Sequence, residues 1–82
     1  MGIKLSRHAR NNMRLYGILE AEISESIQNP DHREKEGEKI VVLRSFRRRF
    51  YGFPLKVVCR KEGNEFFIIT AYPLKKSYRR KI

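Results

Sequence analysis

Apolar positions near the amino terminus recur at the spacing of an α-helix. They stand three or four residues apart, at Leu5, Ala9, Met13 and Tyr16. This spacing places them on one helix face. Ser6 can accept a hydrogen bond from a free amide of the first turn, and Gly17 suits the positive φ of a residue that ends a helix. The pattern predicts a helix over Arg7–Tyr16.

A second helix is expected directly after the first. Ile23 and Ile27 repeat at a spacing of four, and acidic residues in the first turn complement the helix dipole. Leu19 is a poor amino-terminal cap because its side chain cannot accept a hydrogen bond. An Asn-Pro pair follows Gln28 and ends the helix, since a residue before proline avoids helical backbone angles. We predict a helix over Leu19–Gln28.

The second half of the chain changes to a strand pattern. Three runs rich in β-branched and aromatic residues are predicted strands, over Lys39–Phe46, Leu55–Arg60 and Glu65–Tyr72. Their short connections favour an antiparallel meander. The polar stretch His32–Glu38 is expected to be a loop, and Ile3–Leu5 can add a short edge strand.

These elements predict an α+β fold with the order β-α-α-β-β-β if the edge strand forms. A two-helix hairpin packs on one face of a three- to four-stranded antiparallel sheet and leaves the other face free to bind. A chain of 82 residues is short enough for one domain, which we place at residues 1–73. Residues 74–82 are expected to form a basic carboxy-terminal tail.

Charge is distributed unevenly along the chain. There are 19 Lys and Arg residues against 9 Asp and Glu, a formal net charge of +10. Acidic residues gather in residues 19–38, whereas residues 1–18, 39–60 and the tail are basic. This predicts one acidic flank and one broad basic face, which attracts polyanions because bound phosphates release counterions. Nucleic acid is the first expected partner, and an acidic protein is the alternative.

Several classes of function are excluded by what the sequence lacks. Cys59 is the only cysteine, which excludes an intrachain disulfide and cysteine-based zinc sites. Neither histidine stands in a metal-binding motif, so we expect no metal and no cofactor. No apolar run is long enough to cross a membrane, and no secretory signal is present. A reducing, cytoplasmic location is therefore expected.

A basic and aromatic loop is the main candidate for binding nucleic acid. In the run Arg47-Arg48-Arg49-Phe50-Tyr51 the arginines can grip phosphates, and the aromatic rings, Tyr51 above all, can stack on bases. The alternative is a solvated hairpin tip. Further candidate phosphate contacts are Arg14, Lys75, Lys76, Arg79 and Arg80.

Few side chains in this sequence can support catalysis without a metal. The candidate catalytic residues are His8, Arg44, Lys56, Thr70 and Tyr72. Histidine or tyrosine can move a proton to or from a ribose hydroxyl or a leaving oxygen. Arg44 and Lys56 can neutralise charge that grows on a phosphate in the transition state. This set suits metal-independent cleavage of RNA.

Each of these residues also has a purely structural interpretation. His8 lies beside the apolar face of the first predicted helix and can be a half-buried residue bonded to the backbone. Thr70 and Tyr72 lie two residues apart, so they are expected to share a strand face with Phe66 and Ile68 and can pack in the core. The two basic residues can be ordinary solvent-facing charges.

Four short motifs, spread between residues 4 and 73, carry a resemblance to known proteins. They are Ser6-Arg7-His8-Ala9, Tyr16-Gly17-Ile18, Ile27-Gln28-Asn29-Pro30 and Ile69-Thr70-Ala71-Tyr72. The sequence resembles small uncharacterised prokaryotic domains of the RelE-like toxin superfamily, within the barnase–EndoU–colicin–RelE ribonuclease fold. The order of a strand, two helices and a meander is similar to that fold.

The resemblance implies a metal-independent endoribonuclease of the toxin–antitoxin type, or a relative that has lost the activity. It implies active-site roles for His8, Thr70 and Tyr72, with free or ribosome-bound RNA as substrate and an acidic antitoxin as partner. Related sequences often carry arginines four and eight residues after the histidine, where this chain has Asn12 and Tyr16. A nucleic-acid-binding domain without catalysis and a basic protein-interaction domain remain the alternatives.

Overall fold

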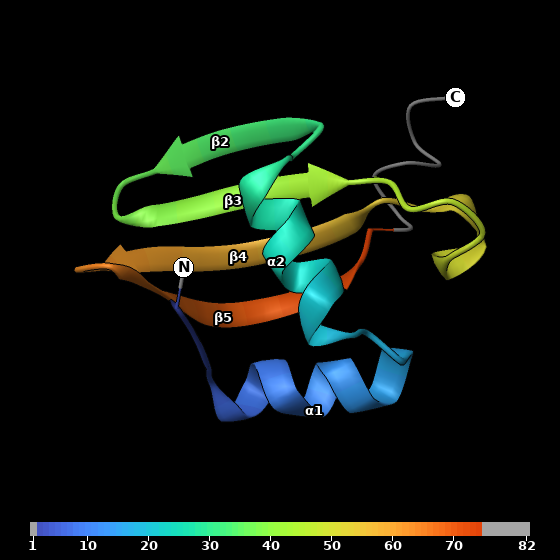
Figure 1. Cartoon of the computed structure of the whole chain (residues 1–82), viewed down its shortest axis with the longest axis horizontal. Helices are drawn as coiled ribbons and strands as arrows, with labels where there is room; N and C mark the ends of the chain where they lie inside the picture. The colour runs from blue at the N-terminus through green and yellow to red at the C-terminus, as the bar shows by residue number, and fades with distance from the viewer. Residues whose placement is uncertain (1, 75–82) are drawn as a thin grey trace.

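The computed structural model describes residues 2–74 and contains two helices beside a five-stranded sheet (Figure 1). The strands are β1 (Gly2–Leu5), β2 (His32–Glu36), β3 (Lys39–Arg44), β4 (Leu55–Glu62) and β5 (Glu65–Pro73). The helices are α1 (Arg7–Tyr16) and α2 (Glu20–Gln28), and a short 3-10 turn spans Phe50–Gly52. The predicted α+β class is confirmed.

The sheet is mixed, so the prediction of an antiparallel sheet was wrong. Its strand order is β1-β5-β4-β3-β2. The predicted antiparallel meander is formed by β3, β4 and β5, and β2 extends it by one antiparallel strand. β1 instead runs parallel to β5, with Ile3 opposite Phe66. Two parallel strands need a long crossover connection between them. Here both helices and the strands β2, β3 and β4 lie between β1 and β5 in the chain and form this connection. The prediction of the meander rested on short links and contained no information about β1.

The segment predicted as a loop at His32–Glu38 instead contains β2 and a tight turn. Gly37 has φ +63° and joins β2 to β3, with Glu36 opposite Lys39 across the turn. Every residue of β2 is exposed, so its sequence shows no alternation of apolar and polar positions. A charged edge strand of this kind resists pairing with other chains.

The helix ends follow from local hydrogen bonds. Ser6 Oγ accepts from the Ala9 amide at 3.0 Å, and Gly17 closes α1 with φ +67°, so the predicted bounds of α1 are confirmed. The second helix begins at Glu20, one residue later than predicted. There the backbone amide of Leu19 donates to Glu22 Oε1 at 2.9 Å, which compensates for the missing capping side chain.

The core lies between α2 and one face of the sheet. Its fully buried apolar side chains are Ala9, Ile23, Val42, Leu55, Val57, Cys59, Ile68 and Ala71. In Figure 1, α2 crosses this face of the sheet, and α2 contacts both β3 and β4. We call this side the covered face. Within residues 2–74, no helix lies over the opposite side, which we call the uncovered face.

The first helix lies along an edge of the sheet. β1 pairs only with the first half of β5, so the backbone carbonyls along the second half have no partner from β1. Ser6 Oγ donates to the Ile69 carbonyl at 2.8 Å, and Asn12 Nδ2 donates to the Ala71 carbonyl at 3.1 Å. α1 thus satisfies the edge of β5 beyond β1, because buried backbone acceptors without partners are costly.

Candidate nucleic-acid interface

Three of the predicted catalytic residues lie together on the uncovered face. Lys56 of β4 is opposite Tyr72 of β5, and Thr70 is opposite Val58 two pairs further along, on the same face. The Lys56 ammonium lies 5.6 Å from the centre of the Tyr72 ring, a cation–π contact. The side chains of Lys56, Thr70 and Tyr72 are all half-buried. The packing around them holds a cation, a hydroxyl and an aromatic ring in fixed positions.

A β-bulge decides which face these residues occupy. Cys59 is opposite Ile68 and Val58 is opposite Thr70, so Ile69 is an extra residue in β5. One extra residue reverses the alternation of side chains along the strand. Ile68 is therefore fully buried on the covered face, while Thr70 and Tyr72 face the other way. The expectation that Thr70 and Tyr72 share a face with Phe66 and Ile68 was wrong.

A second aromatic ring extends the group along the uncovered face. Phe67 is opposite Arg60, and the guanidinium lies 4.9 Å from the ring centre. Arg60 Nε also donates to Glu62 at 2.7 Å, which offsets part of its charge. Lys56 has no hydrogen bond to a carboxylate and no ion pair within residues 2–74. Of the two cations that contact aromatic rings on this face, Lys56 is therefore the one without a carboxylate partner in the described residues.

The pairing of Arg44 with Lys56 at one site was wrong. Arg44 is opposite Leu55, so its side chain is on the covered face, whereas Lys56 lies on the other. Arg44 donates to the Asn29 carbonyl at 2.6 Å and forms an ion pair with Glu25 at 3.4 Å. Its Nε is buried without a hydrogen-bond partner in the described part of the chain. Arg44 ties the end of α2 to β3.

His8 stands on α1 one turn before Asn12. Its side chain is exposed and makes no hydrogen bond or ion pair within residues 2–74. Asn12 donates to Thr70 Oγ1 at 3.2 Å as well as to the Ala71 carbonyl. Residues four apart are neighbours on a helix surface, so His8 lies on the part of α1 that borders β5. In the sequence, Asn12 stands out only as a departure from related sequences, and nothing in its spacing indicates this contact with β5.

The last of the three arginines in the basic loop has a structural role. Arg49 donates to both carboxylate oxygens of Glu22, at 2.5 and 2.9 Å, and to the Gly17 carbonyl at 2.6 Å. It also lies 4.6 Å from the centre of the Phe50 ring. Arg49 was predicted to bind nucleic acid, but its guanidinium is engaged by the junction of the two helices.

The ion pair shifts the pKa values of both partners. Burial of Glu22 opposes its ionisation, but hydrogen bonds from Arg49 and the Leu19 amide outweigh burial and lower the pKa of Glu22 below 4.5. The hydrogen bond to Glu22 raises the pKa of Arg49 further. The pair stays charged at neutral pH and fixes the loop against the helices.

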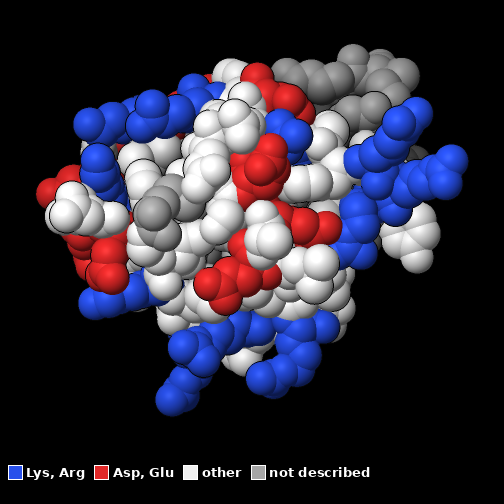
Figure 2. Space-filling model, viewed as in Figure 1, with Lys and Arg blue, Asp and Glu red and all other residues white. Residues whose placement is uncertain are grey.

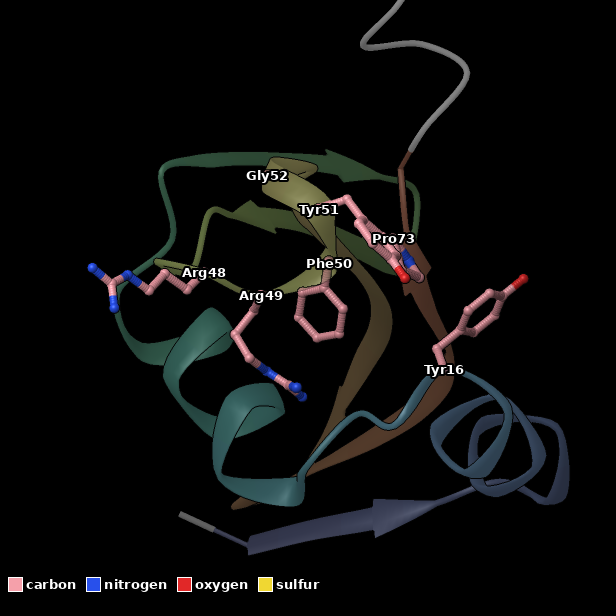
Figure 3. A pocket seen from close by; sticks show the side chains of 7 residues that line it. All are labelled: Tyr16, Arg48, Arg49, Phe50, Tyr51, Gly52 and Pro73. Carbon is pink, nitrogen blue, oxygen red and sulfur yellow. The ribbon is translucent and has the colours of Figure 1, made fainter.

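The remaining residues of the loop are presented to solvent. Arg47 and Arg48 are exposed, and the Tyr51 side chain is 93% exposed. Arg48 and Tyr51 line a pocket of about 660 Å³ together with Tyr16, Phe50 and Pro73 (Figure 3).

Arg14, predicted to contact phosphate, is also exposed, in the last turn of α1. The other predicted phosphate contacts, Lys75, Lys76, Arg79 and Arg80, lie outside the described residues.

Charges on the helix side of the molecule do not form one basic face. Figure 2 shows acidic groups over α2 in the middle of this view, with basic groups around them along α1, beside the loop and near the β2–β3 hairpin. The predicted acidic flank is thus the centre of this side. Basic side chains surround this acidic centre, and Lys56 lies on the opposite face of the sheet.

Residues 2–74 contain no cluster of acidic, histidine or cysteine side chains that could hold a metal ion. Cys59 is buried, and burial raises the pKa of its thiol to about 11, an effect that the Arg33 charge only partly offsets. No helix in the described residues is both long and apolar enough to cross a membrane.

A family comparison covers most of the chain. The family described as "Domain of unknown function (DUF4258)" matches residues 5–73. No curated protein and no solved structure matches the chain. The matched stretch runs from the end of β1 to the end of β5, and it includes both helices and all residues of the uncovered face discussed above. Because the match spans well over half of the chain, the protein belongs to the DUF4258 family.

Proposed function

We propose that this protein binds single-stranded RNA on its uncovered face. The observation that carries the proposal is the half-buried Lys56–Tyr72 pair, which has no carboxylate partner in the described residues and has Thr70 beside it. A strand face that offers a cation and an aromatic ring can hold a phosphate and stack a base at the same time.

Neighbouring groups support the same function. Phe67 supplies a second ring on this face, under the Arg60 guanidinium. The formal net charge of +10 attracts polyanions over long range. Because base stacking tolerates any sequence, we expect RNA binding with little sequence preference.

The second candidate function is metal-independent cleavage of the bound RNA. The observation that favours it is the contact of Asn12 with Thr70, which joins the His8 surface of α1 to the uncovered face. His8 would transfer a proton to or from the ribose hydroxyl or the leaving oxygen. Lys56 would neutralise charge on the phosphate, and Thr70 and Tyr72 would position it.

The RelE-like resemblance extends this proposal to a toxin that cleaves free or ribosome-bound RNA in the cytoplasm and is covered by an acidic antitoxin. Arg44 has no part in the proposed chemistry, because it lies on the other face of the sheet.

Binding is tested with a fluorescently labelled single-stranded oligoribonucleotide, by anisotropy over a range of salt concentrations. Lys56→Gln is expected to weaken binding about fivefold and to lower the salt slope by about one. The matched control is Lys35→Gln, because Lys35 is an exposed lysine opposite Ile40 on the covered side. Equal affinity of the Lys56→Gln variant and the wild type would contradict RNA binding on the uncovered face. Tight binding of an acidic protein with no salt-dependent RNA binding would favour the protein-interaction alternative.

Cleavage is tested in excess EDTA on free RNA and on translating ribosomes. A metal-independent nuclease cuts in EDTA, and His8→Ala and Tyr72→Phe are expected to reduce turnover by about 100-fold or more while they preserve affinity. Binding without any cut product in either setting would reject the enzyme and leave the RNA-binding function.

A further inference from the structure

A pocket beside the end of β5 is separate from the uncovered face. It has a volume of about 660 Å³, within the usual range for small-molecule sites. Its walls come from the last residue of α1, the loop over residues 48–52 and Pro73. Figure 3 shows the rings of Tyr16 and Tyr51 near Pro73, whereas the Arg48 side chain extends away from them.

The exposure of Tyr51 is enforced by the loop. Arg48, Phe50 and Tyr51 have φ of 54–60°, a left-handed conformation that is unfavourable for residues with a side chain. The loop is anchored on its inner side, since Arg49 is bonded to Glu22 and Phe50 packs edge-on against Phe46 with ring centres 6.4 Å apart. These anchors hold Tyr51 outward, 93% exposed.

The pocket combines flat apolar surfaces with positive charge. Tyr16, Tyr51 and Pro73 offer faces on which a base can stack. No carboxylate is among the described residues that line the pocket, and the nearby Glu22 is neutralised by Arg49. Arg48 lines the pocket, and its side chain extends away from the rings of Tyr16 and Tyr51, so its charge is offered to a phosphate and the space between the rings is left for a base.

We infer that this pocket is a second RNA subsite, which holds one unstacked base of a single strand against Tyr51 and Tyr16. The inference rests on the proposed RNA-binding function. Pro73 follows Tyr72 directly in β5 but is opposite Leu55, so it lies on the covered face. The pocket is therefore one residue beyond the Lys56–Tyr72 pair, around the end of β5. One RNA strand would cross the uncovered face, turn around this end of the sheet and place a base in the pocket.

The experiment uses the whole chain and single-stranded oligoribonucleotides of about 12 nucleotides, each with one 2-aminopurine at a different position. The fluorescence of this base is quenched when it stacks. With the wild type we expect quenching at one position in addition to any on the uncovered face, and Tyr51→Ala removes it. Tyr51→Ala also weakens binding about tenfold, whereas Tyr51→Phe keeps the ring and retains both properties.

A cycle with the RNA confirms which base is held. Replacing the quenched base with an abasic site weakens wild-type binding about tenfold but leaves the affinity of Tyr51→Ala unchanged, because the two changes remove the same contact. Leu15→Ala is the control. Leu15 is an apolar side chain of α1 that is 71% exposed and does not line the pocket, and its removal is expected to leave affinity and quenching unchanged.

The outcomes separate this inference from the proposed function. If Lys56→Gln weakens binding but Tyr51→Ala binds as tightly as the wild type and quenches every probe equally, the pocket is not an RNA subsite and the uncovered face still is. If the wild type binds no RNA, both proposals fail. Loss of affinity in Tyr51→Ala and Tyr51→Phe alike would also overturn the inference, since stacking requires only the ring.

Discussion

The two faces of the sheet use the same strands in opposite ways. On the covered face, β4 and β5 contribute Val57, Cys59 and Ile68, all without solvent exposure. On the uncovered face, the alternate positions carry Lys56 and Tyr72 in cation–π contact. Because strand side chains alternate, one short sequence supplies the core and the proposed binding surface, and substitutions at neighbouring positions are expected to have separate effects.

Basic side chains also differ between the two faces. The covered-side arginines are held by α2 and its ends: Arg44 contacts Asn29 and Glu25, and Arg49 contacts Glu22. Lys56 contacts a ring instead. A carboxylate bound to a cation offsets the positive field that a ligand would feel. The position of a basic residue in the fold therefore decides whether it stabilises the protein or is available to bind a ligand.

The largest expected difference between the faces is in thiol reactivity. Burial raises the pKa of Cys59 from 9.0 to about 11, so its thiolate fraction at about pH 8 is lower by roughly 100-fold. We expect native Cys59 to react with a thiol reagent at least about 100-fold more slowly than the unfolded chain. The rate is measured by the absorbance of the released chromophore.

A thiol on the uncovered face provides the matched comparison. Val58→Cys in a Cys59→Ala background moves the only thiol one residue along β4, to the other face. It should react at least about tenfold faster than Cys59 in the folded protein. Equal rates for the two thiols would show that the uncovered face is as protected as the core.

The next difference is in the cost of removing volume. Val57 is fully buried, whereas its neighbour Val58 is only half-buried. Val57→Ala is expected to lower the free energy of unfolding by about 2.5 kcal/mol and Val58→Ala by about 1 kcal/mol, since only the first leaves a closed cavity. Urea denaturation followed by circular dichroism measures both. A larger loss for Val58→Ala would reverse the assignment of the two faces.

An effect smaller than that of Val57→Ala is expected at the Glu22–Arg49 pair. The folded-state pKa of Glu22 lies below 4.5, so the ionised group stabilises the protein fully above pH 4.5 and loses its contribution as the pH falls through the folded-state pKa. Glu22→Gln is expected to cost about 1–2 kcal/mol at neutral pH. The difference from the wild type should vanish in acid.

The pH dependence of unfolding by urea tests the role of this pair. Glu20→Gln is the control, because Glu20 is an exposed carboxylate of the same helix turn and its replacement leaves the Glu22–Arg49 pair in place. A constant difference between Glu22→Gln and the wild type across acid and neutral pH would show that ionisation of Glu22 is not the source of its stabilising effect.

For the candidate site, local patterns were informative only for neighbours on one element. The spacing of Thr70 and Tyr72 correctly placed them on one strand face, and the bulge left that relation intact because it precedes both. The same reasoning failed for Ile68, on the other side of the bulge. It failed for Arg44 as well, because the relation of Arg44 to Lys56 depends on the register between two strands.

Sequence alone determined the bounds of α1, the approximate position of α2 and the three strands of the meander, because each has its own apolar period, cap or turn. Only the tertiary structure decided the parallel position of β1, the edge strand β2 and the bulge at Ile69. β1 depends on β5, which lies some 60 residues away in the chain. β2 buries no side chain, so nothing in its composition distinguishes it from a loop. Backbone pairing between distant segments therefore set the face on which the proposed RNA-binding residues lie.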